Sequence, residues 1–152
     1  MDAWQEHLGI YAASYVIGVI GGFVPIVNAE VYFATMGATL DRATLLPVVV
    51  LGTLGQMTAK TAIFLAGRGV LRLPVTRDSA RIQAVLAKAR AWRGPMEMFV
   101  FVSAVFGIPP LYIVSLLGGA LEIGVTRFIL LGVSGRLIRF LTIAFGANAA
   151  VG

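Results

Sequence analysis

The sequence is poor in the residues on which many soluble proteins and enzymes depend. It has no cysteine, one histidine and only 12% charged residues in 152 positions. The lack of cysteine excludes a disulfide scaffold and thiolate metal sites, and a single histidine argues against a metalloenzyme or a triad hydrolase. The sequence also contains no P-loop, no dinucleotide-binding glycine motif and no nucleophile elbow. We therefore expect no catalytic residues, no metal and no cofactor, and a protein that is not an enzyme.

Apolar residues are abundant instead. They make up 59% of the chain, and the mean hydropathy is +0.91. A soluble domain is typically about 45–50% apolar and about 25% charged. The polar side chains here are too few to cover a globular surface. The sequence predicts an all-α integral membrane protein.

Two of the apolar stretches are broken near their middle. Residues 8–40 exceed the roughly 20 residues of one crossing but are short for two, and 96–121 repeat this pattern. Proline removes a backbone donor and ends a helix, so each stretch favours a re-entrant helical hairpin. A kinked span with an interfacial helix is the alternative for the first stretch. The expected helix breaks are Pro25 in the first stretch and Gly107, Pro109 and Pro110 in the second.

Unbroken stretches follow both broken ones. Residues 44–66 and 124–150 are each long enough for one crossing. We therefore predict a single membrane domain over residues 1–152, with a first half at 8–67, a linker at 68–94 and a second half at 95–150. Two hairpins, each followed by one transmembrane helix, make the second half inverted relative to the first, as in many secondary transporters.

Weak sequence similarity between the halves supports this inverted repeat. Met36-Gly37-Ala38 resembles Leu117-Gly118-Gly119-Ala120, and each closes a broken stretch. Gly52-Thr53-Leu54-Gly55-Gln56 likewise parallels Gly132-Val133-Ser134-Gly135-Arg136. The same order of both matches after a proline-broken stretch favours a repeat over chance.

The linker between the halves is basic. Its apolar residues recur at helical spacing, which predicts an amphipathic helix on an anionic membrane surface. The positive-inside rule then places the linker in the cytoplasm. Topology explains this charge, so we expect no nucleic-acid partner. The basic residues are Arg68, Arg72, Arg77, Arg81, Lys88, Arg90 and Arg93.

Polar residues within the apolar stretches are the candidate transport site. A carboxylate at Glu30 must pair or protonate inside a membrane, unless the hairpin is shallow and the side chain reaches headgroups. Arg136 and Arg139 lie halfway along the last stretch and share a helix face. Unless these arginines extend to the headgroups, they require anions, and a lipid phosphate is one candidate. The site residues predicted from the sequence are Glu30, Arg136, Arg139, Lys60, Asn28 and Gln56.

Four motifs, taken in order, resemble the DedA superfamily, also called the VTT or SNARE-associated domain. The segment from Gly21 to Glu30 resembles its first re-entrant motif, with a proline before a membrane-embedded acid. Ala66-Gly67-Arg68 resembles the end of the second span. Pro109-Pro110 through Ala120 resembles the second re-entrant motif, and Gly135-Arg136-x-x-Arg139-Phe140 the final element. The similarity covers about residues 18–145.

The resemblance implies lipid movement. Members of the superfamily are associated with lipid scrambling and, in some bacteria, with the return of undecaprenyl phosphate across the cytoplasmic membrane. Glu30, Arg136 and Arg139 match the functional motifs. The chain departs from them at Ala104 and Tyr112, near the places of two arginines, and at Gln56, where a second acid often stands.

These observations predict a lipid transporter or scramblase for an anionic, phosphate-bearing lipid, with undecaprenyl phosphate as one candidate. Two alternatives are an ion- or proton-coupled transporter of small solutes and a structural, partner-binding membrane subunit. The expected partners are membrane lipids, in the bacterial cytoplasmic membrane. Association of the chain with further copies of itself is compatible with the sequence.

Overall fold

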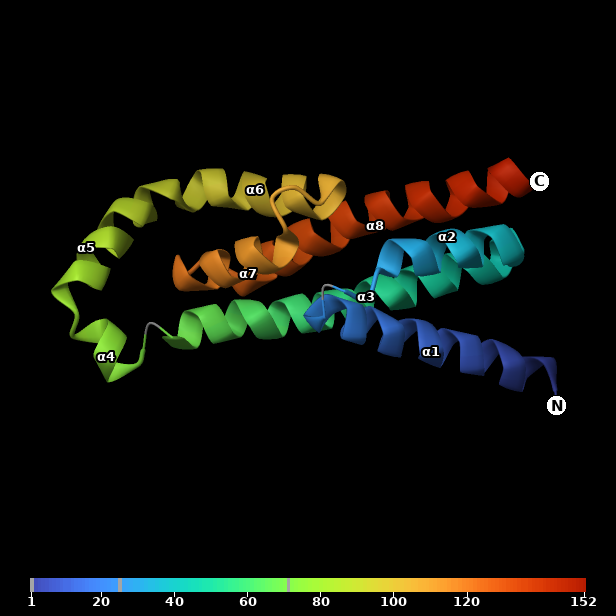
Figure 1. Cartoon of the computed structure of the whole chain (residues 1–152), viewed down its shortest axis with the longest axis horizontal. Helices are drawn as coiled ribbons and strands as arrows, with labels where there is room; N and C mark the ends of the chain where they lie inside the picture. The colour runs from blue at the N-terminus through green and yellow to red at the C-terminus, as the bar shows by residue number, and fades with distance from the viewer. Residues whose placement is uncertain (1, 25, 71) are drawn as a thin grey trace. The chain divides into compact units, whose positions relative to one another are not determined.

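The computed structural model describes residues 2–24, 26–70 and 72–152, so the predicted break residue Pro25 lies outside the described part of the chain. All regular elements in these ranges are helical, as predicted, and none of them is a strand. Figure 1 shows the elements in chain order: α1 (Ala3–Phe23), α2 (Ala29–Thr39), α3 (Arg42–Val70), α4 (Pro74–Arg77), α5 (Ala80–Ala89), the 3-10 helix η1 (Arg90–Trp92), α6 (Arg93–Phe106), α7 (Leu111–Ala120) and α8 (Val125–Val151).

The helices divide into two compact units. Unit 1 comprises residues 1–59 and 136–152, and unit 2 comprises residues 60–135. Unit 1 contains α1 and α2, and unit 2 contains α4 to α7 with η1. The long helices α3 and α8 each contribute one part to each unit. Each unit therefore combines residues from both halves of the sequence.

In unit 1 the chain reverses direction between α1 and α2 (Figure 1). Helix α1 ends at Phe23 and α2 begins at Ala29, on either side of the proline-containing segment. The hydroxyl groups of Ser14 in α1 and Tyr32 in α2 lie 2.7 Å apart, within hydrogen-bond distance. This contact joins the two helices through side chains, and Ser14 is fully buried.

Glycines in unit 1 allow close approach of the helices. A Cβ added to Gly55 of α3 would collide with the backbone of Tyr15 in α1, and one on Gly37 of α2 would collide with the backbone of Ala144 in α8. Side chains cannot be accommodated at such contacts, so these positions require glycine. The core of the unit is formed by Ala29, Phe33, Leu45, Val49, Phe140 and Ala144.

Unit 2 uses similar contacts. The chain reverses between α6, which ends at Phe106, and α7, which begins at Leu111 (Figure 1). The segment between them contains Gly107 with a positive φ of 78° and a cis bond between Ile108 and Pro109. Positive φ is readily adopted by glycine. The three break residues predicted for this stretch, Gly107, Pro109 and Pro110, thus lie between the two helices.

Glycines again mediate the helix contacts of unit 2. A Cβ on Gly119 of α7 would collide with the backbone of Phe64 in α3, and one on Gly135 of α8 would collide with Ala104 in α6. The rings of Phe64 and Phe128 stack with centroids 4.4 Å apart. Unit 2 therefore has an aromatic core between its parts of α3 and α8.

The basic linker is helical in short segments rather than in one piece. Helix α3 continues to Val70, past the predicted start of the linker, and α4, α5 and η1 follow. The basic side chains of α5 and its surroundings are exposed, and so are several apolar ones. The exposed basic residues are Arg72, Arg77, Arg81, Lys88 and Arg90, and the exposed apolar ones include Leu73, Val75, Ile82 and Val85.

In the described part of the chain, two helices are long and apolar enough to cross a membrane. They are α3, with 29 residues, and α8, with 27 residues. The sequence predicted one crossing in each of these regions, at 44–66 and 124–150. Two further apolar helices, at Gly94–Phe106 and Leu111–Ala120, are shorter. The fold is thus compatible with a helical membrane protein.

Candidate functional site

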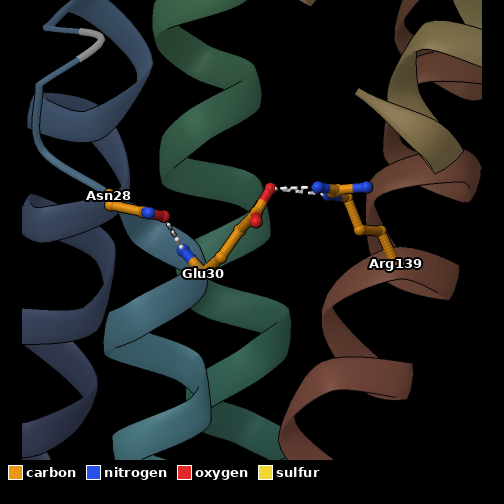
Figure 2. A network of polar contacts seen from close by, with 3 residues as sticks. All are labelled: Asn28, Glu30 and Arg139. Carbon is orange, nitrogen blue, oxygen red and sulfur yellow. Dashed lines mark hydrogen bonds and ion pairs between the residues drawn. The ribbon is translucent and has the colours of Figure 1, made fainter. Parts of the chain in front are cut away.

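Helix α2 begins at a side-chain cap that also positions Glu30. Asn28 has an extended backbone conformation, and its Oδ1 accepts a hydrogen bond of 2.9 Å from the backbone N–H of Glu30 (Figure 2). Asparagine is a preferred N-cap because its oxygen satisfies an N–H group that has no partner within the helix. Glu30 therefore lies in the first turn of α2, where the helix dipole favours a negative charge.

The carboxylate of Glu30 pairs with Arg139 of α8. The Nε of Arg139 donates a hydrogen bond of 2.8 Å to Glu30 Oε1, and Nη2 of the same guanidinium donates to the same oxygen (Figure 2). The Arg139 side chain is 20% exposed and that of Glu30 is 41% exposed. The two residues are 109 positions apart in the sequence, and their pair joins α2 to α8. Its carboxylate remains accessible from outside the core.

Arg136 lies one turn before Phe140 on α8 and is much more deeply buried. Only 8% of the residue is exposed, and its guanidinium lies over the Phe140 ring at 5.6 Å from the centroid. Within the described residues its buried Nε has no hydrogen-bond partner. Arg136 interacts electrostatically with both Arg139 and Glu30. A buried guanidinium with an unsatisfied donor is costly, because its water contacts are lost without replacement.

The site therefore brings two guanidinium groups near one carboxylate. Glu30 forms its ion pair with Arg139, and Arg136 contributes a second positive charge. Inside a protein such a charge is stabilised by an anion, by an aromatic face or by water. Phe140 provides the aromatic face. This arrangement is suited to binding an anionic group.

Gln56 and Lys60 are the remaining two predicted residues. Gln56 is buried in the part of α3 that belongs to unit 1, and its backbone contacts α1 near Gly22. Its Oε1 has no hydrogen-bond partner within the described residues. Lys60 belongs to unit 2, where its buried ammonium lies 5.8 Å from the centroid of the Tyr112 ring. Of the six predicted residues, Asn28, Glu30, Arg136 and Arg139 are linked to one another by a hydrogen bond, an ion pair and electrostatic interactions.

Sequence reasoning missed Asn148 near the end of α8. Its Nδ2 donates hydrogen bonds of 3.0 Å to the backbone carbonyls of Gly37 and Leu40 at the end of α2. The available signal was a lone amide side chain in the apolar stretch 124–150. Arg68 was identified as a basic linker residue and as part of the Ala66-Gly67-Arg68 motif, but its hydrogen bond to the carbonyl of Ile123 was not predicted.

No family model, curated protein or solved structure matches the chain. The resemblance to the DedA superfamily therefore stays a prediction from the sequence motifs. Among the described residues, no group of three or more His, Asp or Glu side chains is placed to hold a metal ion. The chemistry of the site is that of its guanidinium, carboxylate and amide groups.

Proposed function

We propose that this protein is an integral membrane transporter or scramblase that moves an anionic, phosphate-bearing lipid between leaflets. The observation that carries the proposal is the buried Arg136 beside the Glu30–Arg139 pair. Two guanidiniums with one carboxylate leave a positive charge that a lipid phosphate can neutralise. Arginine suits this role because its planar fork of N–H donors matches phosphate oxygens.

The proposal places α3 and α8 across the membrane. Both have the length and composition for a crossing. The two helical pairs, α1 with α2 and α6 with α7, are then the re-entrant hairpins expected from the sequence. Breaks in a helix inside a bilayer are tolerated where the free backbone groups face protein or water. Such breaks near charged side chains are typical of substrate sites in transporters.

Matching contacts within the two units support an inverted repeat. In unit 1, Gly37 of the second short helix meets Ala144 of a long helix, and in unit 2 Gly119 meets Phe64 in the same way. The long helices also correspond, because Gly55 meets α1 and Gly135 meets α6. The similarity between the segments around these glycines was already visible in the sequence.

The resemblance to the DedA superfamily supports a lipid as the substrate and the bacterial cytoplasmic membrane as the location. Glu30, Arg136 and Arg139 are the positions that match the motifs of that superfamily. Undecaprenyl phosphate is one lipid that fits the proposed site, because its headgroup is a phosphate. Gln56 stands where a second acid often stands in that superfamily, so the chain departs from the motif at this position.

Reconstitution in vesicles tests this function. Purified protein is inserted into liposomes that contain a trace of fluorescent lipid, and a membrane-impermeant quencher reports how fast the label leaves the inner leaflet. We expect faster loss of a label on a phosphate-bearing anionic lipid than in vesicles without protein. Equal rates with and without protein, over a range of protein densities, would contradict the proposal.

A proton-coupled transporter of small solutes is the second candidate. It is favoured by the Glu30–Arg139 pair, because ionisable residues within membrane segments commonly mark substrate, ion or proton pathways. The same proteoliposomes distinguish the two functions. Lipid movement without a proton gradient supports the first, whereas uptake of a solute only under a gradient supports the second.

The orientation of the linker has its own test. The positive-inside rule places α5 and its exposed basic residues in the cytoplasm. The chain has no cysteine, so single cysteines at Ala84 and Ala87, two exposed positions of α5, can be introduced without a background signal. We expect neither thiol to react with a membrane-impermeant reagent in intact cells and both to react after lysis. Rapid labelling in intact cells would reverse the proposed topology.

A further inference from the structure

Helices α2 and α8 run parallel and contact each other at successive levels. The Glu30–Arg139 pair lies at one end of the contact, with a sequence separation of 109. The Leu40–Asn148 hydrogen bond lies at the other end, with a separation of 108. Because the separation is nearly constant, the two helices advance together along the contact. The rings of Phe33 and Phe140, tilted by 35° with centroids 4.4 Å apart, lie between these ends.

Asn148 binds the C-terminal end of α2 from outside that helix. Its Nδ2 donates to the carbonyls of both Gly37 and Leu40 at 3.0 Å. The last carbonyls of a helix have no partner within it, so a side chain from a neighbouring helix can satisfy them. Arg42 Nε donates to Asn148 Oδ1 at 3.3 Å, which directs the NH2 group of the amide toward α2.

This contact determines where Glu30 lies along α8. Helix α2 has only 11 residues, and so short a helix is marginal without tertiary contacts. One helical turn is about 5.4 Å, so a slip of one turn would separate Glu30 from Arg139. Asn148 opposes such a slip because its two donors match only the carbonyls at the end of the helix. The close contact of Gly37 with the backbone of Ala144 supports the same register through the fit of the two helices.

Unit 2 contains an independent version of the same contact. There Gly119 of α7 meets the backbone of Phe64, and Arg68, one turn later on α3, donates to the carbonyl of Ile123 just after α7. In unit 1, Asn148 likewise stands one turn after Ala144, which Gly37 meets. Different residue types thus occupy corresponding positions and act on the same kind of acceptor.

We propose that Asn148 is a positioning residue for the Glu30–Arg139 site. By holding the C-terminal end of α2 on α8, it keeps the carboxylate at the N-terminal end opposite Arg139. Asn148 acts through the helix rather than by touching the substrate. Its effect on transport rests on the proposed function, whereas its effect on the ion pair does not.

A double-mutant cycle tests the coupling without any transport measurement. Thermal unfolding in detergent is compared for the wild-type protein, Asn148→Leu, Glu30→Gln and the double variant. We expect each single change to lower the Tm by about 2–6 °C, since 1 kcal/mol corresponds to about 2–4 °C in a chain of this size. If Asn148 positions Glu30, the double variant loses little more than the larger single loss. Additive losses would mean two independent contacts and would overturn the proposal.

Transport assays add a second readout with matched variants. Asn148→Asp keeps the acceptor for Arg42 but has no N–H donors, so we expect transport to fall as far as in Glu30→Gln. Asn148→Gln keeps the amide, so we expect it to retain part of the transport activity that Asn148→Asp loses. Thr142→Val is the control, because the exposed Thr142 hydroxyl donates only to Ile138 of its own helix. An Asn148→Asp variant with wild-type transport, beside an inactive Glu30→Gln, would also overturn the proposal.

The two failures can be told apart. If the Tm losses are strongly non-additive but no variant, Glu30→Gln included, changes lipid movement, the positioning role stands and the proposed function fails. If the Tm losses are additive while Glu30→Gln abolishes lipid movement, the proposed function stands and the positioning role fails.

Discussion

Units 1 and 2 share their packing contacts but differ in their chemistry. Each has a short helix that meets a long helix through glycine, at Gly37 and at Gly119. In unit 1 the residue seven positions before this glycine is Glu30, which pairs with Arg139. In unit 2 the residue seven positions before Gly119 is Tyr112, whose ring lies near Lys60. The same packing therefore supports an ion pair in one unit and a cation–π contact in the other.

The difference indicates where specificity for a charged substrate would lie. An arginine–carboxylate pair can exchange one anion for another, because a phosphate can replace the carboxylate. In a cation–π contact, by contrast, the partner of the positive charge is a neutral ring, which a phosphate does not replace. We infer that unit 1 carries the binding chemistry proposed here, whereas the corresponding position of unit 2 is structural. The following predictions test this contrast, from the largest expected effect to the smallest.

Removing the charge of Glu30 should have the largest effect. Glu30→Gln keeps the shape of the side chain but loses a charged hydrogen bond, which is typically worth about 1.5–3 kcal/mol, or roughly a ten- to hundredfold change in rate. We expect lipid movement to fall by that factor in vesicles, at unchanged protein level. The matched control is Glu97→Gln, which removes the acid of the Arg127–Glu97 pair in unit 2. Equal losses in both variants would remove the contrast between the units.

Substitution of Arg139 should separate charge from geometry. Lysine keeps the positive charge but loses the planar fork of donors. We expect Arg139→Lys to reduce lipid movement about tenfold, the loss of roughly 1.4 kcal/mol, and Arg139→Ala to reduce it further. An Arg139→Lys variant with full activity, beside an inactive Arg139→Ala, would count against a phosphate site. Such a result would fit a headgroup anchor, for which lysine serves equally well.

Glycine substitutions test whether the packing of the units is equivalent. An added methyl group at Gly37 or Gly119 would collide with the backbone of a neighbouring helix, so we expect both Ala variants to be destabilised by about 1–3 kcal/mol. Gly146→Ala is the control on α8, because nothing lies within 4 Å of its added Cβ. Thermal unfolding in detergent measures all three. A large loss at only one of the two contact glycines would show that the units are packed differently.

Changes at Tyr112 should have a smaller effect than those at Glu30. Tyr112→Phe keeps the ring that lies near Lys60, so we expect lipid movement within about twofold of wild type. Tyr112→Leu removes a cation–π contact, worth about 0.5–2 kcal/mol, and should mainly lower the Tm. If Tyr112→Phe abolished lipid movement, the hydroxyl group would belong to the site, and unit 2 could no longer be called structural at this position.

The smallest expected effect concerns the start of α3. Asp41 accepts hydrogen bonds from the hydroxyl group of Thr44 at 2.7 Å and from its backbone N–H at 3.0 Å. These bonds lower the pKa of Asp41, the side-chain bond most. A carboxyl group with a lowered pKa in the folded state stabilises the fold above its unfolded pKa, and this stability is lost as the pH falls through the folded pKa. We expect Asp41→Asn to weaken the fall of Tm in acid slightly. An identical acid profile would show that the bonds do not matter for stability.

The sequence determined the helical class, the two long apolar helices and the polar residues of interest. Inside a bilayer, a long apolar stretch can satisfy its backbone hydrogen bonds within itself only as a helix, so this prediction follows from composition and length. The expectation that Glu30 needs a partner also follows from the cost of an unpaired charge. The lengths of the two broken apolar stretches likewise indicated a change of chain direction near Pro25 and near Pro109. The family resemblance and the function stay predictions.

Only the tertiary structure decided which residues meet. Arg139 rather than Arg136 pairs with Glu30, because the parallel contact of α2 and α8 brings that residue level with the carboxylate. Asn148 donates hydrogen bonds to the backbone carbonyls of Gly37 and Leu40, which are more than 100 positions away in the sequence. No local sequence pattern predicts such a contact. Lys60 and Gln56 looked alike in the sequence as polar residues one turn apart, yet they belong to different units. Partner choice depends on the register of packed helices, and a sequence pattern specifies the faces of a helix but not the register between two of them.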